Sequence, residues 1–158
     1  MTVALRPARP GEAAALTALI LRSKAYWGYD DAFMAACEEE LTVTEERLTG
    51  GMFIVAVDRS ETPLGAAEIS FEGAIAWLEK LFVDPEAMGR GVGRALFEWA
   101  VETADEGGAT ALIIAADPDA EAFYRTLGAE RDGDIASDSI PGRRLPRLVV
   151  ELSAHQPP

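Results

Sequence analysis

The chain has 158 residues, 49% of them hydrophobic, which is enough for one globular domain with a sizeable core. We expect that domain over residues 1–153 and a short tail over 154–158. With 14 Lys and Arg against 27 Asp and Glu, the net charge of −13 argues against nucleic acid or an anionic membrane as a partner. Cys37 is the lone cysteine, which excludes an intrachain disulfide, and the lone histidine, His155, with no Cys/His cluster, leaves no metal site. Without a long apolar run or a signal-peptide stretch, we expect a cytoplasmic protein.

The first half of the chain predicts strands and two helices. A strand is expected at Val3–Pro7, followed by a helix that Pro10 opens, since a first-turn residue needs no amide hydrogen. Helical spacing predicts a second helix from Asp30 or Asp31 to about Glu40, with Cys37 as a small core residue rather than a nucleophile. Three strands follow, at Met52–Asp58, at Leu64–Phe71 and up to about Val83.

The second half continues the alternation of helices and strands. A helix is expected from about Arg90 to Asp105, and the apolar run Thr110–Ala115 predicts a strand with both faces covered. Asp117 and Pro118 are typical of a helix start, and Gly128 of a helix end. The last two strands are expected near Ala129–Asp132 and at Leu145–Leu152. This order of elements indicates a layered α/β domain.

The most informative segment is 78-LEKLFVDPEAMGRGVGRALFEWA-100, a strand that leads through a Gly-rich turn into a helix. Glycines at 89, 91 and 93 remove the Cβ atoms that would keep an anion away from the backbone. The first amides of a helix have no internal partner and favour a phosphate. The turn therefore predicts a phosphate site, and the alternative is a turn that only permits tight strand-to-helix packing. The spacing fits neither a nucleotide-triphosphate P-loop nor the G-x-G-x-x-G dinucleotide motif.

This segment resembles the GNAT superfamily of acetyl-CoA-dependent N-acetyltransferases, whose signature has small residues where Gly91 and Gly93 stand. The resemblance implies an α/β GNAT fold: a central mixed, mostly antiparallel sheet flanked by helices on both faces. It implies acetyl-CoA as co-substrate and no metal. It implies that strand residues bind the pantetheine arm, namely Leu81, Phe82 and Val83. It implies that the turn and the start of the helix bind the pyrophosphate, through Met88, Gly89, Arg90, Gly91, Val92, Gly93 and Arg94.

Met88 departs from the family pattern, which usually has Gln or Arg at that position. Backbone amides need no particular side chain, so binding survives this change, and Arg90 or Arg94 is a candidate replacement for the lost side-chain contact. Arg94 also has the spacing of a solvated ion pair with Glu98.

A second segment, 117-DPDAEAFYRTLGAE-130, resembles another family motif through Ala120, Tyr124 and Gly128. Asp117 stands where Asn is common, and we assign it to the cofactor site. The resemblance implies that Tyr124 is the general acid for the departing thiolate; its alternative role is packing beside Phe123. A backbone amide near Val83 is the implied donor to the oxyanion.

Glu79 is the candidate general base that deprotonates the amine. Strand alternation predicts that it shares a face with Trp77, Leu81 and Val83, where partial burial would raise its pKa. The strand LEKLFV is similar to that of spermidine/spermine acetyltransferases, which carry a glutamate there. The alternative is a surface glutamate paired with a lysine.

The segment 23-SKAYWGYDD-31 is rich in aromatic residues for a connection between helices. We interpret Tyr26, Trp27 and Tyr29 as the wall of an acceptor pocket, with core packing as the alternative, and Arg143 as a residue that the 139–144 loop could add. The sequence thus predicts direct acetyl transfer to a small-molecule primary amine. A non-catalytic acyl-CoA-binding module, a protein N-terminal or lysine acetyltransferase, and a homodimeric assembly stay open.

Overall fold

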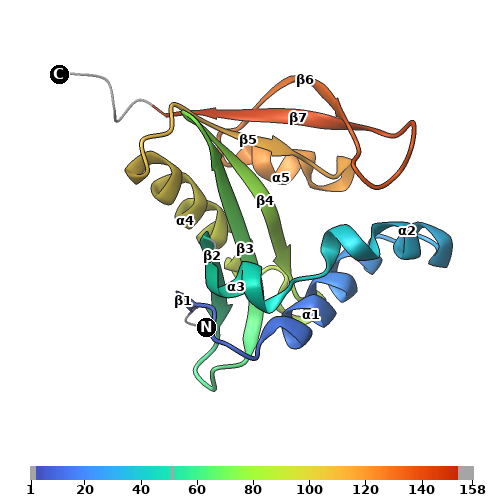
Figure 1. The fold of residues 1–158 in the computed structure, drawn as a ribbon, viewed down its shortest axis with the longest axis vertical. Coiled ribbons are helices and arrows are strands. Elements are labelled where there is room, and N and C mark those ends of the chain that lie inside the picture. Colours follow the sequence, from blue (N-terminus) through green and yellow to red (C-terminus); the bar gives the residue numbers. More distant parts are fainter. Residues whose placement is uncertain (1–2, 51, 153–158) are drawn as a thin grey trace.

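The structure is a computed structural model that describes residues 3–50 and 52–152, so the tail expected at 154–158 lies outside the described residues. Its centre is a seven-stranded sheet in the order β1-β2-β3-β4-β5-β7-β6 (Figure 1). The strands are β1 (Ala4–Pro7), β2 (Met52–Val57), β3 (Pro63–Glu72), β4 (Ile75–Val83), β5 (Ala111–Ala115), β6 (Glu130–Ala136) and β7 (Arg144–Glu151). The described α-helices are α1 (Ala13–Ala25), α2 (Asp31–Leu41), α3 (Glu45–Gly50), α4 (Val92–Glu106) and α5 (Glu121–Thr126). Two 3-10 turns, Pro85–Ala87 and Pro118–Ala120, precede α4 and α5.

Helices cover both faces of this sheet, in which β4 and β5 are the one parallel pair among the described strands. On one face α1, α2 and α3 pack against β2 and β3, and the buried cluster there includes Leu16, Ile20, Cys37, Leu48 and Val55. On the other face α4 and α5 pack through Phe97, Ala100, Tyr124, Leu112 and Ile114. The layers confirm the predicted fold and place Cys37 in the core.

The sheet opens between its two parallel strands. β4 and β5 pair only over 75–77 and 111–113; beyond that point β4 continues beside β3, and β5 continues beside β7. Figure 1 shows β6 and β7 crossing the upper part of the molecule at a steep angle to β3 and β4. The edge of β4 that faces β5 is therefore left without a strand partner over 78–83.

The first helix begins later than the sequence predicts. Pro10 lies ahead of α1, which starts at Ala13. The reason is a contact from far along the chain: the Glu45 carboxylate accepts hydrogen bonds from the amides of Gly11 (2.6 Å) and Ala13 (2.9 Å). Glu45 belongs to α3, a six-residue helix that is too short to show a helical period and that the sequence does not predict.

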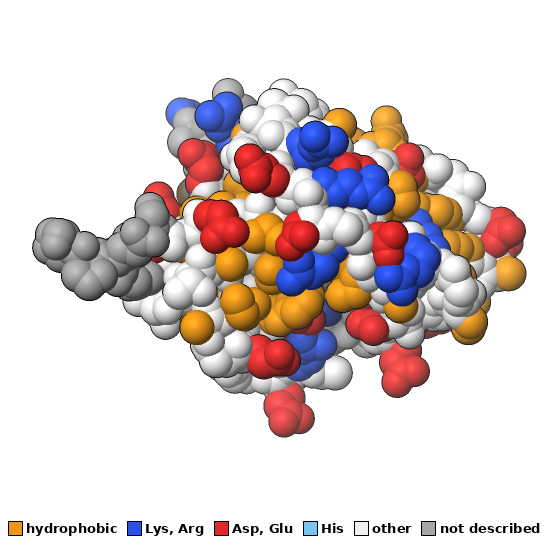
Figure 2. Space-filling model, turned by 90° about the horizontal axis from the view of Figure 1, so that it is seen from above, with side chains coloured by type: hydrophobic (Ala, Val, Ile, Leu, Met, Phe, Trp, Pro, Cys, Tyr) orange, Lys and Arg blue, Asp and Glu red, His pale blue; other side chains and the backbone are white. Residues whose placement is uncertain are grey.

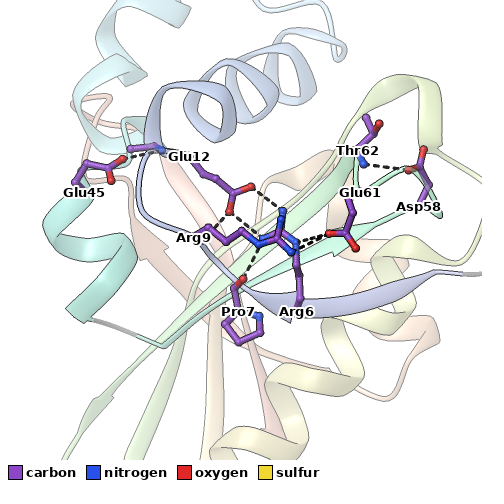
Figure 3. A network of polar contacts seen from close by, with 9 residues as sticks. Arg6, Pro7, Arg9, Glu12, Glu45, Asp58, Glu61 and Thr62 are labelled. Atoms are coloured by element: carbon purple, nitrogen blue, oxygen red, sulfur yellow. Dashed lines mark hydrogen bonds and ion pairs between the residues drawn. The ribbon is translucent and has the colours of Figure 1, made fainter.

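A polar network fixes β1 against the start of α1 (Figure 3). Arg6 donates from Nη1 and Nη2 to the two carboxylate oxygens of Glu12, at 2.9 and 2.7 Å. Arg6 and Arg9 also donate to Glu61, each at 3.1 Å. The hydrogen bonds from Arg6 outweigh burial and lower the pKa of Glu12.

Acidic and basic side chains are interspersed on the face seen from above (Figure 2). Ion pairs of Arg147 with Asp132 (2.6 Å) and of Arg144 with Asp134 join β6 to β7. β6 runs further than predicted, to Ala136, because its register shifts between Arg131 and Asp134 and pairing resumes beyond that shift.

No helix in the described part of the chain is long and apolar enough to cross a membrane.

Candidate active site

A cavity of about 480 Å³ lies where the sheet opens. Its walls come from 78–83 of β4, from the turn and first residues of α4 at 87–94, and from the segment 114–124 that leads from β5 into α5. Residues of α1 and α2 close a further side. The cavity therefore brings the two motif segments of the sequence into one site.

The backbone of β4 presents a free edge to this cavity. The amide of Asp84 donates to Leu64 in β3 at 2.8 Å. Because successive residues in a strand direct their N–H groups to opposite edges, the amides of Leu81 and Val83 point away from β3 and into the gap. Phe82, between them, packs its side chain with the α1–α3 cluster. This edge can hydrogen-bond an extended amide-bearing arm, the role predicted for Leu81 and Val83.

The three glycines of the turn serve two different purposes. Gly89 and Gly91 have φ of +80° and +81°, with no atom within 4 Å of an added Cβ, so the backbone conformation is what requires glycine there. Gly93 is in the first turn of α4, and a Cβ would lie 3.0 Å from Cζ of Phe123. Tight packing, the alternative reading of the motif, therefore explains Gly93, while Gly89 and Gly91 shape the turn.

The start of α4 supplies unpaired donors to the cavity. The first hydrogen bond of the helix runs from Ala95 N–H to Gly91 C=O (3.1 Å), so the amides at 92–94 have no partner within the helix. They lie at the positive end of the helix dipole. Met88 and Arg94 line the cavity, although Arg94 also lies 3.9 Å from Glu98 in the solvated pair considered above. Arg90 is exposed and outside the lining.

Glu79 occupies a β-bulge, and this corrects the predicted alternation. Glu68 pairs with Lys80 and Ile69 pairs with Leu78, so Glu79 is an extra residue that no residue of β3 faces in the backbone register. The bulge shifts the alternation, so Trp77 does not continue on the face of Leu81 and Val83. Glu79 is exposed rather than partly buried, lines the cavity, and accepts a hydrogen bond from Ser70 Oγ at 3.0 Å.

Tyr124 is a core residue whose ring also reaches the cavity. It is 6% exposed and packs against Phe97 and Phe123, with ring centroids 5.9 and 5.1 Å away. No hydrogen bond to its hydroxyl is found within the described ranges. Burial, followed by the negative charge of Asp117, raises the pKa of Tyr124 above its ordinary value of 10. The phenol is protonated at neutral pH with or without this shift, so it carries the proton that a donor needs.

Asp117 is the centre of a cluster that closes one end of the cavity. Its Oδ2 accepts hydrogen bonds from Lys24 (2.6 Å) and the Tyr29 hydroxyl (2.7 Å), and its Oδ1 accepts from the amide of Asp119 (2.9 Å). Arg143 donates to the Tyr29 hydroxyl at 2.9 Å and lies 3.7 Å from Asp117. Burial would raise the pKa of Asp117, but these hydrogen bonds lower it, whereas burial and Asp117 raise the pKa of Tyr29 to about 12.

The aromatic connection contributes one of its three predicted residues to the cavity wall. Trp27 lines the cavity. Tyr26 is 57% exposed at the end of α1 and lies outside the lining, so the prediction for it is corrected. Tyr29 is also outside the lining, because it stacks on Phe33 at 4.0 Å and reaches Asp117 instead. Arg143 does line the cavity, so its loop folds over the site.

Several residues of the acceptor side are not predicted from the sequence. Lys80 and Ser23 are both 5% exposed and line the cavity, as do Lys24 and Glu40. Desolvation, followed by the nearby charge of Asp138, raises the pKa of Glu40. For Lys80 the sequence contains a signal, because a charged residue stands inside the apolar strand LEKLFV. For Glu40 it contains no signal, because the acidic residues at the end of α2 are typical of a solvated helix face.

These features fit an acyl-coenzyme A thioester. The unpaired edge of β4 suits a pantetheine arm, and the amides that begin α4 suit a pyrophosphate. A protonated phenol and carboxylates stand in the same cavity, as acyl transfer to an amine requires. Among the described residues, no group of three or more His, Cys, Asp or Glu side chains is placed to hold a metal ion.

The comparisons with known proteins agree with this geometry. The acetyltransferase (GNAT) family matches residues 18–129, which is more than half of the chain. The chain therefore belongs to the GNAT family and is an acetyltransferase that acts with acetyl-CoA. No curated relative matches this sequence.

Solved structures share the fold over nearly the whole chain. A GCN5-related N-acetyltransferase from Rhodopseudomonas palustris is 25% identical, with a TM-score of 0.78 over 96% of this chain and 97% of that one. The PaiA N-acetyltransferase of Thermoplasma acidophilum, solved with coenzyme A, is 16% identical, with a TM-score of 0.78 over 96% and 99%. YncA of Salmonella typhimurium, solved with acetyl-CoA, is 21% identical, with a TM-score of 0.68 over 100% and 98%.

Proposed function

We propose that this acetyltransferase moves the acetyl group of acetyl-CoA directly to the primary amine of a small molecule. The observation that carries the proposal is one cavity of about 480 Å³ whose lining includes the free edge of β4, the start of α4, Tyr124 and Glu79. Donor-binding and acid–base groups that face one space favour transfer in a single complex of both substrates.

The donor site is assigned to the backbone of β4 and of the turn before α4. Acetyl-CoA supplies the thioester. The amides of Leu81 and Val83 would bind its pantetheine arm, and those of 88–93 its pyrophosphate. Arg94, which lines the cavity, would add a side-chain charge there, and Arg90 lies outside the lining. Asp117 would support the site by position, because both of its oxygens already have partners.

Three groups of this chain would handle the protons and the developing charge. Glu79, exposed in the cavity wall, accepts the proton of the amine directly or through a water molecule. A backbone amide near Val83, other than those that bind the pantetheine arm, would donate to the oxygen that becomes negative during transfer. Tyr124, which lines the cavity, donates its proton to the departing thiolate.

An acceptor of small size is favoured by the walls of the cavity. Residues of α1 and α2, with Trp27 and Arg143, bound the acceptor side, whereas an acetylated protein chain needs an open groove. Acetylation of a protein N-terminus or lysine is the alternative. A cytoplasmic location and a homodimer stay predictions.

Release of free thiol from acetyl-CoA, measured across primary amines, amino acids and peptides, tests the proposal. We expect release with one or more small amines and none above background with peptides. Turnover of peptides alone would make the chain a protein acetyltransferase. Binding of acetyl-CoA without thiol release for any acceptor would make it a non-catalytic module.

A further inference from the structure

The bulge in β4 places two consecutive residues of opposite charge in one cavity. In a regular strand, neighbouring side chains point to opposite faces. Glu79 is the extra residue of the bulge, and both Glu79 and Lys80 line the cavity. An acidic and a basic residue therefore line the cavity from adjacent positions of β4.

Lys80 has donors that the described residues leave unused. It is 5% exposed, and its Nζ lies 3.4 Å from Oε1 of Glu68, which is long for a hydrogen bond between charged groups. Arg47 already donates to the other oxygen of Glu68, with Nε at 3.1 Å and Nη2 at 3.0 Å. Two cations thus share one carboxylate, and an ammonium group with three N–H donors has one long contact.

The acidic excess of the chain does not extend into the cavity. The whole chain has 27 acidic and 14 basic residues, almost two to one. The cavity lining has equal numbers: the acidic residues are Glu40, Glu79, Asp117 and Asp119, and the basic residues are Lys24, Lys80, Arg94 and Arg143. Lys24 and Arg143 lie at the Asp117 end of the cavity, where Asp119 is a second carboxylate. At Lys80 the paired carboxylate, Glu68, is shared with Arg47.

We propose that the acceptor carries a carboxylate beside its primary amine, and that Lys80 binds this carboxylate; the inference rests on the proposed acetylation of small amines. The adjacency of Glu79 and Lys80 suits a molecule in which amine and carboxylate are separated by few bonds, such as an α-amino acid. A polyamine would bring a second cation against Lys80, and like charges are repelled. Lys80 thereby determines specificity without taking part in proton transfer.

The test compares each amino acid with the amine that remains when its carboxylate is removed: lysine with cadaverine, ornithine with putrescine, tyrosine with tyramine and tryptophan with tryptamine. Thiol release at saturating acetyl-CoA gives kcat/KM for both members of each pair. We expect the accepted amino acid to exceed its amine by about 10- to 100-fold, the range for a hydrogen bond to a charged group. The difference should lie mainly in KM.

Two variants isolate Lys80 without leaving an unmatched carboxylate. Glu68→Gln keeps Lys80 and should keep the preference. Glu68→Gln combined with Lys80→Met differs only by the ammonium group, and the preference should disappear through a higher KM for the amino acid. The stabilisation of each variant by acetyl-CoA, measured by melting, verifies that the fold and the donor site are intact.

Three outcomes would overturn the inference. If amines are acetylated as well as their amino acids, the inference is wrong and the proposed function stands. If the double variant keeps the preference of Glu68→Gln, the carboxylate is bound elsewhere and the assignment of Lys80 is wrong. If no small acceptor causes thiol release, the proposed function is wrong and this inference is wrong with it.

Discussion

A single hydroxyl group separates Tyr124 from phenylalanine. The ring packs in the core on Phe97 and Phe123, so Tyr124→Phe should leave the fold and acetyl-CoA binding unchanged. If the phenol protonates the thiolate, kcat should fall by about 10²–10⁴-fold. Tyr26→Phe makes the same change on an exposed residue outside the cavity and should have no effect. An equal kcat for Tyr124→Phe and wild type, with chemistry limiting the rate, would assign the proton to water.

The base can be identified by comparing two carboxylates of the cavity wall. Glu79→Gln should lower the rate at neutral pH and move the pH profile to the alkaline side, where free amine is abundant. Glu40→Gln is the matched change, since the raised pKa of Glu40 makes it the competing candidate. If only Glu40→Gln changes the pH profile, Glu40 is the general base and Glu79 is not.

For single residues, the sequence identifies which residue types carry the chemistry but not the direction in which each side chain points. Tyr124 follows from its motif, whereas Glu79 is placed on the wrong face because a bulge of one residue cannot be read from the pattern LEKLFV. Lys80 is missed for the same reason, since regular alternation directs it away from Glu79.

Among the elements, the turn before α4 tests donor binding. Acetyl-CoA at about 100 times its Kd should stabilise the protein by roughly 2.7 kcal/mol, and Gly91→Glu should abolish this effect by bringing a negative charge to the pyrophosphate. Gly108→Glu is a close control at the other end of α4, because Gly108 has φ of +92° against +81° for Gly91 and both have open space. Both changes strain the backbone, but Gly108→Glu should keep the acetyl-CoA shift. Equal loss of that shift in the two variants would reject the turn as the binding site.

The polar network between β1 and the start of α1 predicts a dependence of stability on pH. Glu12→Gln should lower the free energy of unfolding at pH 7 by about 1–2 kcal/mol, because it removes a charged hydrogen bond to Arg6. The pKa of Glu12 is lowered from 4.5 in the folded state, so its contribution is present above 4.5 and is lost as the pH falls through the folded value. Denaturant unfolding should show the two proteins converging in acid. Glu61→Gln, at a carboxylate that is 55% exposed, should cost less. A gap between wild type and Glu12→Gln that persists far below 4.5 would contradict the assignment.

Strands and helices with clear periods are predicted well, and their ends are not. The β2 and β5 ranges and the start of α2 follow from the sequence, because apolar runs and an Asp cap define them. The start of α1 does not, because Glu45, more than thirty residues away, binds the amides that precede and open the helix.

For the whole molecule, the net charge of −13 predicts a response to salt. Self-repulsion of excess acids disfavours the compact state, and salt screens it. The Tm should rise between low ionic strength and about 0.15 M salt; a gain of 1 kcal/mol corresponds to about 2–4 °C for a chain of this size. A Tm that falls over this range would show that the ion pairs, rather than the repulsion, dominate.

The closure of the cavity is also a property of the whole chain that the sequence does not reveal. Lys24 and Asp117 are 93 positions apart, and Tyr29 and Arg143 are 114 positions apart. The sequence singles out Tyr29, Arg143 and Asp117 one by one, in three separate segments, and does not indicate that they meet. Their association depends on the opening of the sheet, which no local pattern encodes.

The parting of β4 and β5 gives the protein an exposed strand edge in the middle of its sheet rather than at its margin. An outer edge can recruit a strand of another chain and so promote aggregation. This inner edge lines the cavity, where an extended molecule can pair with it. Deuterium exchange should therefore be fast at the Leu81 and Val83 amides of the free protein and slow when coenzyme A is bound, while the Asp84 amide, already bonded to Leu64, exchanges slowly in both states.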